Sequence, residues 1–185
     1  MSVQKIGVVV GSLRLESFNR KIARALVKLA PKSLEFDFID ISSLSLYNQD
    51  LDEKPPESWI KLRKEIKSFD GILFATPEYN RSVPGVLKNA IDIGSRPGAE
   101  NAWAGKPCAV ISASPGATGA FGANHHLRQT LTAVNMPTMP HPEVYIGSVH
   151  KYLGSDGEVI NEDTIKVLQR FIDAFANWVS LHAQK

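Results

Sequence analysis

Apolar residues in this chain fall into two kinds of pattern, short continuous runs and longer stretches with helical spacing. The short runs predict buried strands, and the stretches in which apolar residues recur every three or four positions predict amphipathic helices. The two kinds alternate along the chain, which is typical of a parallel sheet covered by helices on both faces. The predicted strands are Ile6–Val10, Leu34–Phe38, Gly71–Thr76, Cys108–Ala113 and Val144–Ile146, and the predicted helices are 18–29, 59–66, one beginning near Pro84, 126–134 and 165–179.

One predicted strand differs from the others. Leu34–Phe38 alternates strictly between apolar and acidic residues, so one of its faces is wetter and it fits the edge of the sheet. Five strands with the second at an edge favour the α/β flavodoxin-like fold, a doubly wound parallel sheet with strand order 2-1-3-4-5. We expect residues 1–185 to form a single flavodoxin-like domain, with its ligand outside the carboxyl ends of the first and third strands.

Composition narrows the class of protein and its partners. Of the 185 residues, 43% are hydrophobic and 22% are charged, which is ordinary for a globular protein. The net charge is +2 and the pI is near 8.6, and basic and acidic residues are interleaved, so no nucleic-acid partner is expected. No apolar run approaches the roughly 20 residues of a membrane span. The single cysteine, Cys108, fits a reduced core thiol and hence a cytoplasmic protein, and the spacing of the five histidines predicts no metal site.

The first loop, residues 11–19, follows a buried strand and leads directly into a helix. A helix N-terminus carries unpaired backbone N–H groups and partial positive charge, so it suits a phosphate group. Ser12, Ser17 and Asn19 add short donors, and the guanidinium of Arg14 can hold two phosphate oxygens. This segment therefore predicts a phosphate site.

Two familiar phosphate motifs are absent from this loop. It has no Gly-Lys-Ser/Thr, as a P-loop would, and it has one glycine, Gly11, where the dinucleotide fingerprint needs three. The simplest ligand is a single terminal phosphomonoester, whose two negative charges suit an arginine. The alternative is an ordinary helix cap, with Ser17 as the N-cap and Arg14 in solvent.

Two further loops follow the third and fourth predicted strands at the same edge of the sheet. Residues 77–85 contain two prolines, which fix the directions of backbone N–H and C=O groups and suit the polar edge of a flat heterocycle. Residues 114–122 are rich in glycine, which lets the backbone approach a ligand closely, although a flexible surface loop has the same composition. A phosphate site, an edge-reading loop and a glycine-rich wall together suggest FMN.

Two segments carry a resemblance to a known family. Gly-Ser-Leu-Arg-x-x-Ser-Phe-Asn at 11–19 and Pro-Glu-Tyr-Asn-x-Ser-x-Pro-Gly-x-Leu-Lys-Asn-Ala-Ile-Asp at 77–92 resemble the motifs of the NADPH-dependent FMN reductases, and the soluble chromate and quinone reductases among them look most similar. The resemblance implies FMN as cofactor and NAD(P)H as co-substrate. It also implies hydride transfer through flavin N5 to small-molecule acceptors such as quinones, free flavin, chromate or azo dyes, by a homodimer or homotetramer.

The resemblance further implies a role for each loop. The first would hold the FMN phosphate, the second would line the isoalloxazine ring largely through main-chain atoms, and the third would lie beside the ribityl chain or the ring. No catalytic acid or base is implied, because the cofactor carries the chemistry. The cofactor-binding residues would be Ser12, Arg14, Ser17, Phe18 (through its backbone N–H) and Asn19 in the first loop, Pro77, Glu78, Tyr79 and Asn80 in the second, and Ser114 and Gly116 in the third.

Several polar residues also have simpler explanations. Glu78 could act as a base, but a glutamate that supports its turn explains it as well, and Tyr79 could cover the core instead of a ligand. Lys88 and Asp92 lie four apart on a predicted helix, which predicts a solvated ion pair. Other residues are expected at the surface or between subunits, namely His125 and His126 and an Arg128–Glu143 pair across a subunit boundary.

Two other functions fit a flavodoxin-like chain. An electron-transfer flavodoxin would bind FMN without oxidising NAD(P)H, but such proteins are strongly acidic and their phosphate loops lack an arginine, unlike this chain with its pI near 8.6 and Arg14. A subunit that has lost FMN and only assembles is disfavoured by the intact first loop. No second arginine cluster suits a 2′-phosphate, so NADH and NADPH both stay candidates.

Overall fold

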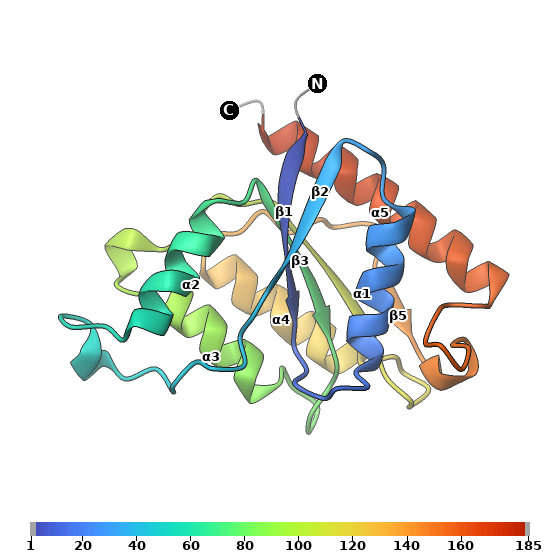
Figure 1. The fold of residues 1–185 in the computed structure, drawn as a ribbon, viewed down its shortest axis with the longest axis horizontal. Coiled ribbons are helices and arrows are strands. Elements are labelled where there is room, and N and C mark those ends of the chain that lie inside the picture. Colours follow the sequence, from blue (N-terminus) through green and yellow to red (C-terminus); the bar gives the residue numbers. More distant parts are fainter. Residues whose placement is uncertain (1–2, 184–185) are drawn as a thin grey trace.

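A computed structural model describes residues 3–183 and has the predicted architecture, a parallel sheet in the order β2-β1-β3-β4-β5 with helices packed around it (Figure 1). The expected flavodoxin-like strand order is therefore confirmed. The strands are β1 (Gln4–Val10), β2 (Leu34–Ile39), β3 (Gly71–Thr76), β4 (Cys108–Ala113) and β5 (Val144–Ile146), and the helices are α1 (Phe18–Leu29), α2 (Glu57–Lys67), α3 (Gly85–Gly94), α4 (Phe121–Ala133) and α5 (Glu162–Ala183).

Burial along the strands explains their sequence patterns. Every residue of β3 and β4 is buried, as continuous apolar runs in the middle of a parallel sheet require. β2 pairs only with β1 within the described residues and alternates between buried and more exposed positions, so its predicted place at an edge is confirmed.

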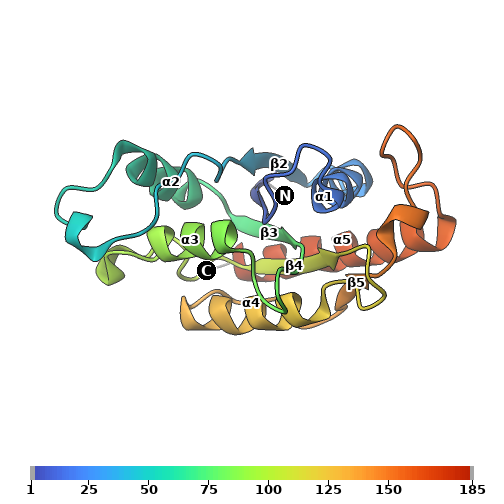
Figure 2. The ribbon, with the colours of Figure 1, turned by 90° about the horizontal axis from the view of Figure 1, so that it is seen from below.

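Two apolar cores lie on opposite faces of the sheet. One contains the buried sides of α1 and α5, with Ile22, Leu26 and Phe175 among its members. The other contains α2, α3 and α4, with Trp59 and Leu127 among its members. Seen from below, the helices lie on both sides of the strands (Figure 2), as the alternating pattern predicts. Within residues 3–183 no helix is long and apolar enough to cross a membrane.

One helix begins earlier than its sequence pattern suggests. α4 starts at Phe121 rather than His126, so the glycine-rich loop after β4 ends at Ala120. Ala120 itself has a left-handed backbone with φ of 62°, and the carboxylate of Glu78 accepts a hydrogen bond from the Ala123 N–H in the first turn. The helix start is thus set by a partner 45 residues away, which a local pattern does not register.

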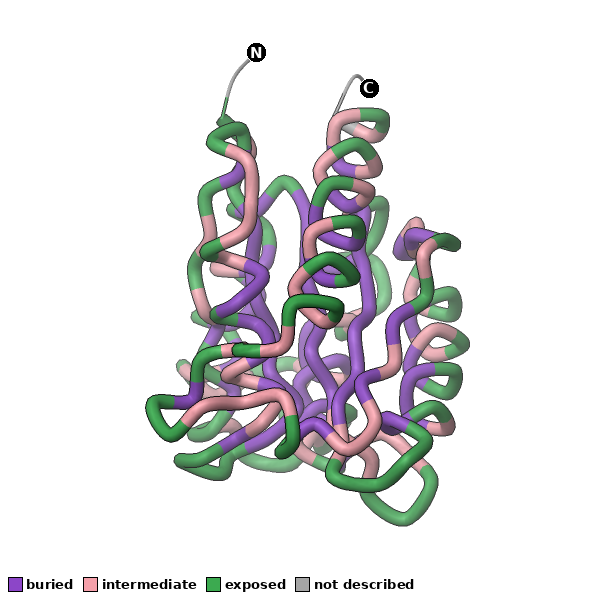
Figure 3. Tube along the Cα trace, turned by 90° about the vertical axis from the view of Figure 1, so that its right-hand side faces the viewer, coloured by how far each residue is buried: buried purple, intermediate pink, exposed green. Residues whose placement is uncertain are grey.

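The carboxyl ends of the strands lie at one end of the molecule and both chain ends lie at the other (Figure 1). Exposed and half-buried loops gather at this carboxyl end, while the strands behind them are buried (Figure 3). The three predicted ligand loops, which follow β1, β3 and β4, all belong to it.

Candidate functional site: three loops at the carboxyl end of the sheet

The first loop ends in a capped helix with donors still available. Ser17 is the N-cap of α1, and its side-chain oxygen accepts a hydrogen bond from the Arg20 N–H at 3.2 Å. The backbone N–H groups of Phe18 and Asn19 have no acceptor within residues 3–183. The helix cap and the phosphate site are therefore compatible, because a cap bond to Arg20 leaves the first two N–H groups of the helix free.

Side chains of the first loop divide into buried hydroxyls and an exposed cation. Ser12 and Ser17 are only 3% and 2% exposed, so their positions are fixed by packing. Arg14 is exposed, and its guanidinium carbon lies 5.6 Å from the centroid of the Phe18 ring. A guanidinium over an aromatic face keeps its in-plane N–H groups available for an anion.

The first and second loops are in direct contact through Gly11. Its N–H donates to the Ala75 carbonyl, and a Cβ added at Gly11 would lie 3.0 Å from Leu87 and 3.3 Å from the Thr76 hydroxyl. A larger residue here would press on the end of β3 and the start of α3. The loops after β1 and β3 therefore line the same point of the sheet, which is where the strand order reverses.

The second loop is a tight turn in a strained conformation. Tyr79 and Ser82 exchange both backbone hydrogen bonds, at 3.1 and 3.0 Å. The two residues between them, Asn80 and Arg81, have φ of 52° and 65°, a left-handed conformation that is unfavourable for an arginine. Tyr79 is 46% exposed, so it does not cover the core. Strain of this kind is common in ligand-binding loops.

Glu78 supports this turn. One of its carboxylate oxygens accepts the Ala123 N–H at 3.0 Å, and the other lies 3.8 Å from the Arg81 guanidinium. A Cβ on Gly122 would lie 2.9 Å from the carboxylate, so a larger residue there would displace the Glu78 side chain. Glu78 thus ties the loop after β3 to the start of α4, which agrees with the supporting role considered from the sequence.

The third loop, residues 114–120, has most of its carbonyls paired within the protein. The Ser114 hydroxyl donates to the Gly116 carbonyl, which also accepts the Ser148 N–H at 3.0 Å. Below the loop, the buried Ser112 hydroxyl donates to the Gly119 carbonyl at 2.8 Å. The N–H groups of residues 116–118 have no acceptor within residues 3–183, but the loop carries no cation, so it is suited to form a wall rather than a phosphate site.

Asn19 has a different place from the one predicted. It is 2% exposed, and its side-chain amide bonds the backbone of Ala113 in both directions, donating to the carbonyl at 2.9 Å and accepting the N–H at 3.1 Å. The side chain therefore joins the first loop to the end of β4. What the residue offers to a phosphate is chiefly its backbone N–H.

These contacts bring all three predicted loops together, and the first of them fits the phosphate of FMN. Two free helix N–H groups lie at the start of α1, and the same loop holds two buried serines and an exposed arginine over the Phe18 ring, a set of donors that suits the oxygen-rich, doubly negative end of the molecule. The second loop presents its backbone on a fixed turn, and the third forms a wall beside it.

Similarity to known proteins agrees with this geometry. Residues 4–151 match the family described as NADPH-dependent FMN reductase. The chain belongs to that family. A quinone reductase of Pseudomonas putida is 55% identical over 181 residues, 97% of each chain. A Burkholderia protein named 2-hydroxy-1,4-benzoquinone reductase is 48% identical and covers 95% of this chain and 96% of its own. A solved structure of FerB, a flavoenzyme NAD(P)H:(acceptor) oxidoreductase from Paracoccus denitrificans, has a TM-score of 0.91 at 46% identity and covers 97% of this chain and 99% of its own.

Membership of the family makes this chain an NAD(P)H-dependent flavin enzyme that uses FMN. The residues that support its loops, however, were not all found from the sequence. Ser112 and Asn124 are both fully buried, and the Asn124 amide donates to the Ser112 hydroxyl at 3.1 Å. The sequence held a signal for each of these two residues. Ser112 is a polar residue near the end of an apolar strand, and Asn124 lies on the buried face of a helix.

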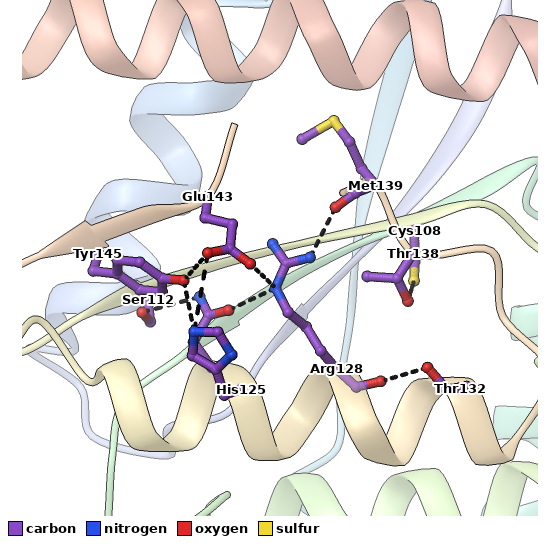
Figure 4. Close-up of polar contacts among 10 residues, drawn as sticks. Cys108, Ser112, His125, Arg128, Thr132, Thr138, Met139, Glu143 and Tyr145 are labelled. Carbon is purple, nitrogen blue, oxygen red and sulfur yellow. Dashed lines mark hydrogen bonds and ion pairs between the residues drawn. The ribbon is translucent and has the colours of Figure 1, made fainter. Parts of the chain in front are cut away.

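The same chain of contacts continues to the surface, where it corrects one expectation (Figure 4). Arg128 donates to the Asn124 side chain at 2.9 Å and to the Met139 carbonyl, and lies 3.7 Å from the Glu143 carboxylate. The Arg128–Glu143 pair therefore forms within one chain, because α4 packs beside β5. Tyr145 bonds both Glu143 and His125, and it lowers the pKa of Glu143 by donating to its carboxylate.

Three smaller expectations also have outcomes. The Lys88–Asp92 ion pair is present at 2.7 Å and is exposed, as predicted. Cys108 is fully buried, and burial raises its thiol pKa to about 12, which fits a packing role. His126 lies at the surface, where its ring nitrogen bonds the Ser82 hydroxyl of the second loop at 2.9 Å.

Proposed function

We propose that this protein is an FMN-dependent quinone reductase in which the three loops of residues 1–185 form a single cofactor site. The observation that carries this proposal is the start of α1, where free N–H groups of Phe18 and Asn19 meet buried Ser12 and Ser17 and exposed Arg14. FMN held at this site would supply the redox chemistry between NAD(P)H and an acceptor, with hydride transfer through its N5.

The chain itself binds and orients. Arg14, Ser12 and Ser17 hold the phosphate through charge and hydrogen bonds, together with the two helix N–H groups. Backbone groups of residues 77–80 line the ring, with Tyr79 exposed beside it and Glu78 holding the turn in place. Ser114 and Gly116 lie in the wall beside the ribityl chain. No side chain is assigned a proton-transfer step.

Acceptor choice follows from an open site. Backbone groups and a rigid turn accommodate flat molecules but discriminate little between their substituents. We therefore expect quinones and free flavin to be reduced. Chromate and azo dyes should be tested in the same assay. Hydroxylated benzoquinones belong in the same panel, because the Burkholderia relative is named for one. NADH and NADPH are both to be tested as donors, because no arginine cluster suited to a 2′-phosphate separates them.

The decisive experiment is spectroscopic. The purified protein should be yellow, with an FMN absorption spectrum that bleaches on anaerobic addition of NADH or NADPH and returns on addition of a quinone. A colourless protein that cannot be reconstituted with FMN would contradict the proposal. Bleaching only in the presence of a separate reductase would instead identify an electron carrier. We also propose that the protein is cytoplasmic and that it forms a homodimer or homotetramer. Light scattering of the holoprotein would distinguish the two oligomeric states.

A further inference from the structure

Asn19 forms a side-chain bridge that resembles the pairing of two strands. It is the second residue of α1, and Ala113 is the last residue of β4, 94 positions later. The amide of Asn19 donates to the Ala113 carbonyl and accepts the Ala113 N–H, at 2.9 and 3.1 Å. A neighbouring strand would satisfy the same two backbone groups in a parallel ladder.

The missing strand partner can be identified. Ser114 donates its N–H to Ile146 of β5, and backbone groups of successive strand residues point to opposite sides, so those of Ala113 point toward β3. The pairing of β3 with β4 ends at Thr76 and Ser112, which places the Thr76 carbonyl opposite the Ala113 N–H but leaves no strand N–H opposite the Ala113 carbonyl. Ala113 is 1% exposed, so without Asn19 its carbonyl would be buried and unpaired.

We propose that Asn19 is a positioning residue that fixes the phosphate loop against the end of β4, and thereby sets the spacing between the parts of the site that hold the two ends of FMN. This inference rests on the proposed function. The phosphate would be held at the start of α1, whereas the ring and ribityl chain would be held by loops that follow β3 and β4. One buried amide connects these regions directly.

The bridge should act on the whole flavin rather than on its phosphate. If it is lost, the two parts of the site are no longer held at a fixed distance, and binding must order them. A direct phosphate contact would affect FMN and leave riboflavin, which lacks the phosphate, unaffected. A bridge that orders the loops should weaken the binding of both ligands by a similar factor.

The test compares Asn19→Ala with a matched control, Asn101→Ala. Asn101 also donates its amide to a backbone carbonyl, that of Val134, and accepts a backbone N–H, that of Trp103, at 2.9 and 3.0 Å. It precedes β4 and contacts the end of α4, so it lies at the opposite end of these elements from the loops. The measurements are dissociation constants for FMN and riboflavin, and amide hydrogen exchange at Ala113 in FMN-free protein.

We expect Asn19→Ala to weaken FMN and riboflavin binding by a similar factor of about 10, the loss expected for roughly one hydrogen bond, and to speed exchange at Ala113. Asn101→Ala should leave both affinities within about twofold. A loss confined to FMN would show that the Asn19 side chain contacts the phosphate and would overturn the proposal, as would unchanged affinities or unchanged exchange at Ala113.

If Asn19→Ala does not fold, Asn19→Gln provides the same test, because it keeps the amide but displaces it by one methylene. The outcome is separable from that of the proposed function. A wild-type chain that binds no FMN would end the proposed function, whereas exchange at Ala113 in the FMN-free variants would still report whether the bridge exists.

Discussion

The first and third loops lie at the same edge of the sheet, yet they fix their polar groups in different ways. In the first, the N–H groups of Phe18 and Asn19 are free within residues 3–183 and Arg14 faces solvent. In the third, most carbonyls are paired, several of them with β4 or with the segment after β5, whereas the N–H groups of residues 116–118 have no acceptor within residues 3–183. The first loop adds a helix N-terminus and a cation to its free donors and therefore suits an anion, while the third has fixed carbonyls and no cation and is suited to shape the space beside it.

An unpaired polar group lowers the stability of the protein less in the first loop than in the buried part of the third. Free donors at a helix start stay solvated until a ligand replaces the water, so they lower stability little. The third loop is exposed at residues 115–118 but buried at Gly119, where an unpaired carbonyl would be expensive, and the Ser112 hydroxyl, held by Asn124, donates to that carbonyl. Substitutions in the first loop should therefore affect affinity, and substitutions beneath the third should affect stability.

The largest effect is expected for Arg14→Ala. Removing a charge-assisted hydrogen bond to phosphate costs roughly 1.5–3 kcal/mol, so the dissociation constant for FMN should rise on the order of 10- to 100-fold. Because Arg14 is exposed, the melting temperature of the FMN-free protein should hardly change. Flavin-fluorescence titration measures the affinity, and an unchanged value would remove Arg14 from the phosphate site.

Ser112→Ala should have the opposite effect, a loss of stability rather than of FMN affinity. It removes the donor to the Gly119 carbonyl and the acceptor for the Asn124 amide, both buried, so the free energy of unfolding should fall by about 2 kcal/mol. Denaturant unfolding of the FMN-free protein measures this loss. Thr132→Ala, which removes an exposed hydroxyl from the same α4, is the control and should change stability by less than about 0.5 kcal/mol. Equal losses in the two variants would contradict a special role for the buried contact.

The second loop should show a smaller effect, because it is expected to act through its backbone. Asn80 has φ of 52°, which glycine adopts without strain, so Asn80→Gly preserves the turn while removing the side chain. FMN affinity should then change by less than about threefold. A loss above about 2 kcal/mol with the turn intact would show that the side chain itself contacts the cofactor.

The smallest functional effect is expected at Cys108, which begins the strand that leads to the third loop. Its thiol pKa of about 12 and full burial predict negligible alkylation of the folded protein at pH 8 and rapid alkylation after unfolding. Because the folded pKa is raised, the thiol favours folding below pH 9 and this contribution declines as pH rises toward 12. Cys108→Ala should reduce that alkaline decline and leave FMN affinity unchanged.

The amino-acid sequence by itself indicated the type and succession of the five strands and five α-helices, because apolar periodicity reports burial directly, and the strict alternation of β2 favoured an edge position. It also located the three loops, since their polar and glycine-rich residues follow strand ends. Only the tertiary structure decided what Asn19, Ser112 and Glu78 contact, where α4 begins, and that Arg128 meets Glu143 within one chain. These contacts join residues far apart in sequence, and the direction of a buried amide or carboxylate depends on unpaired backbone groups that exist only after the sheet has formed.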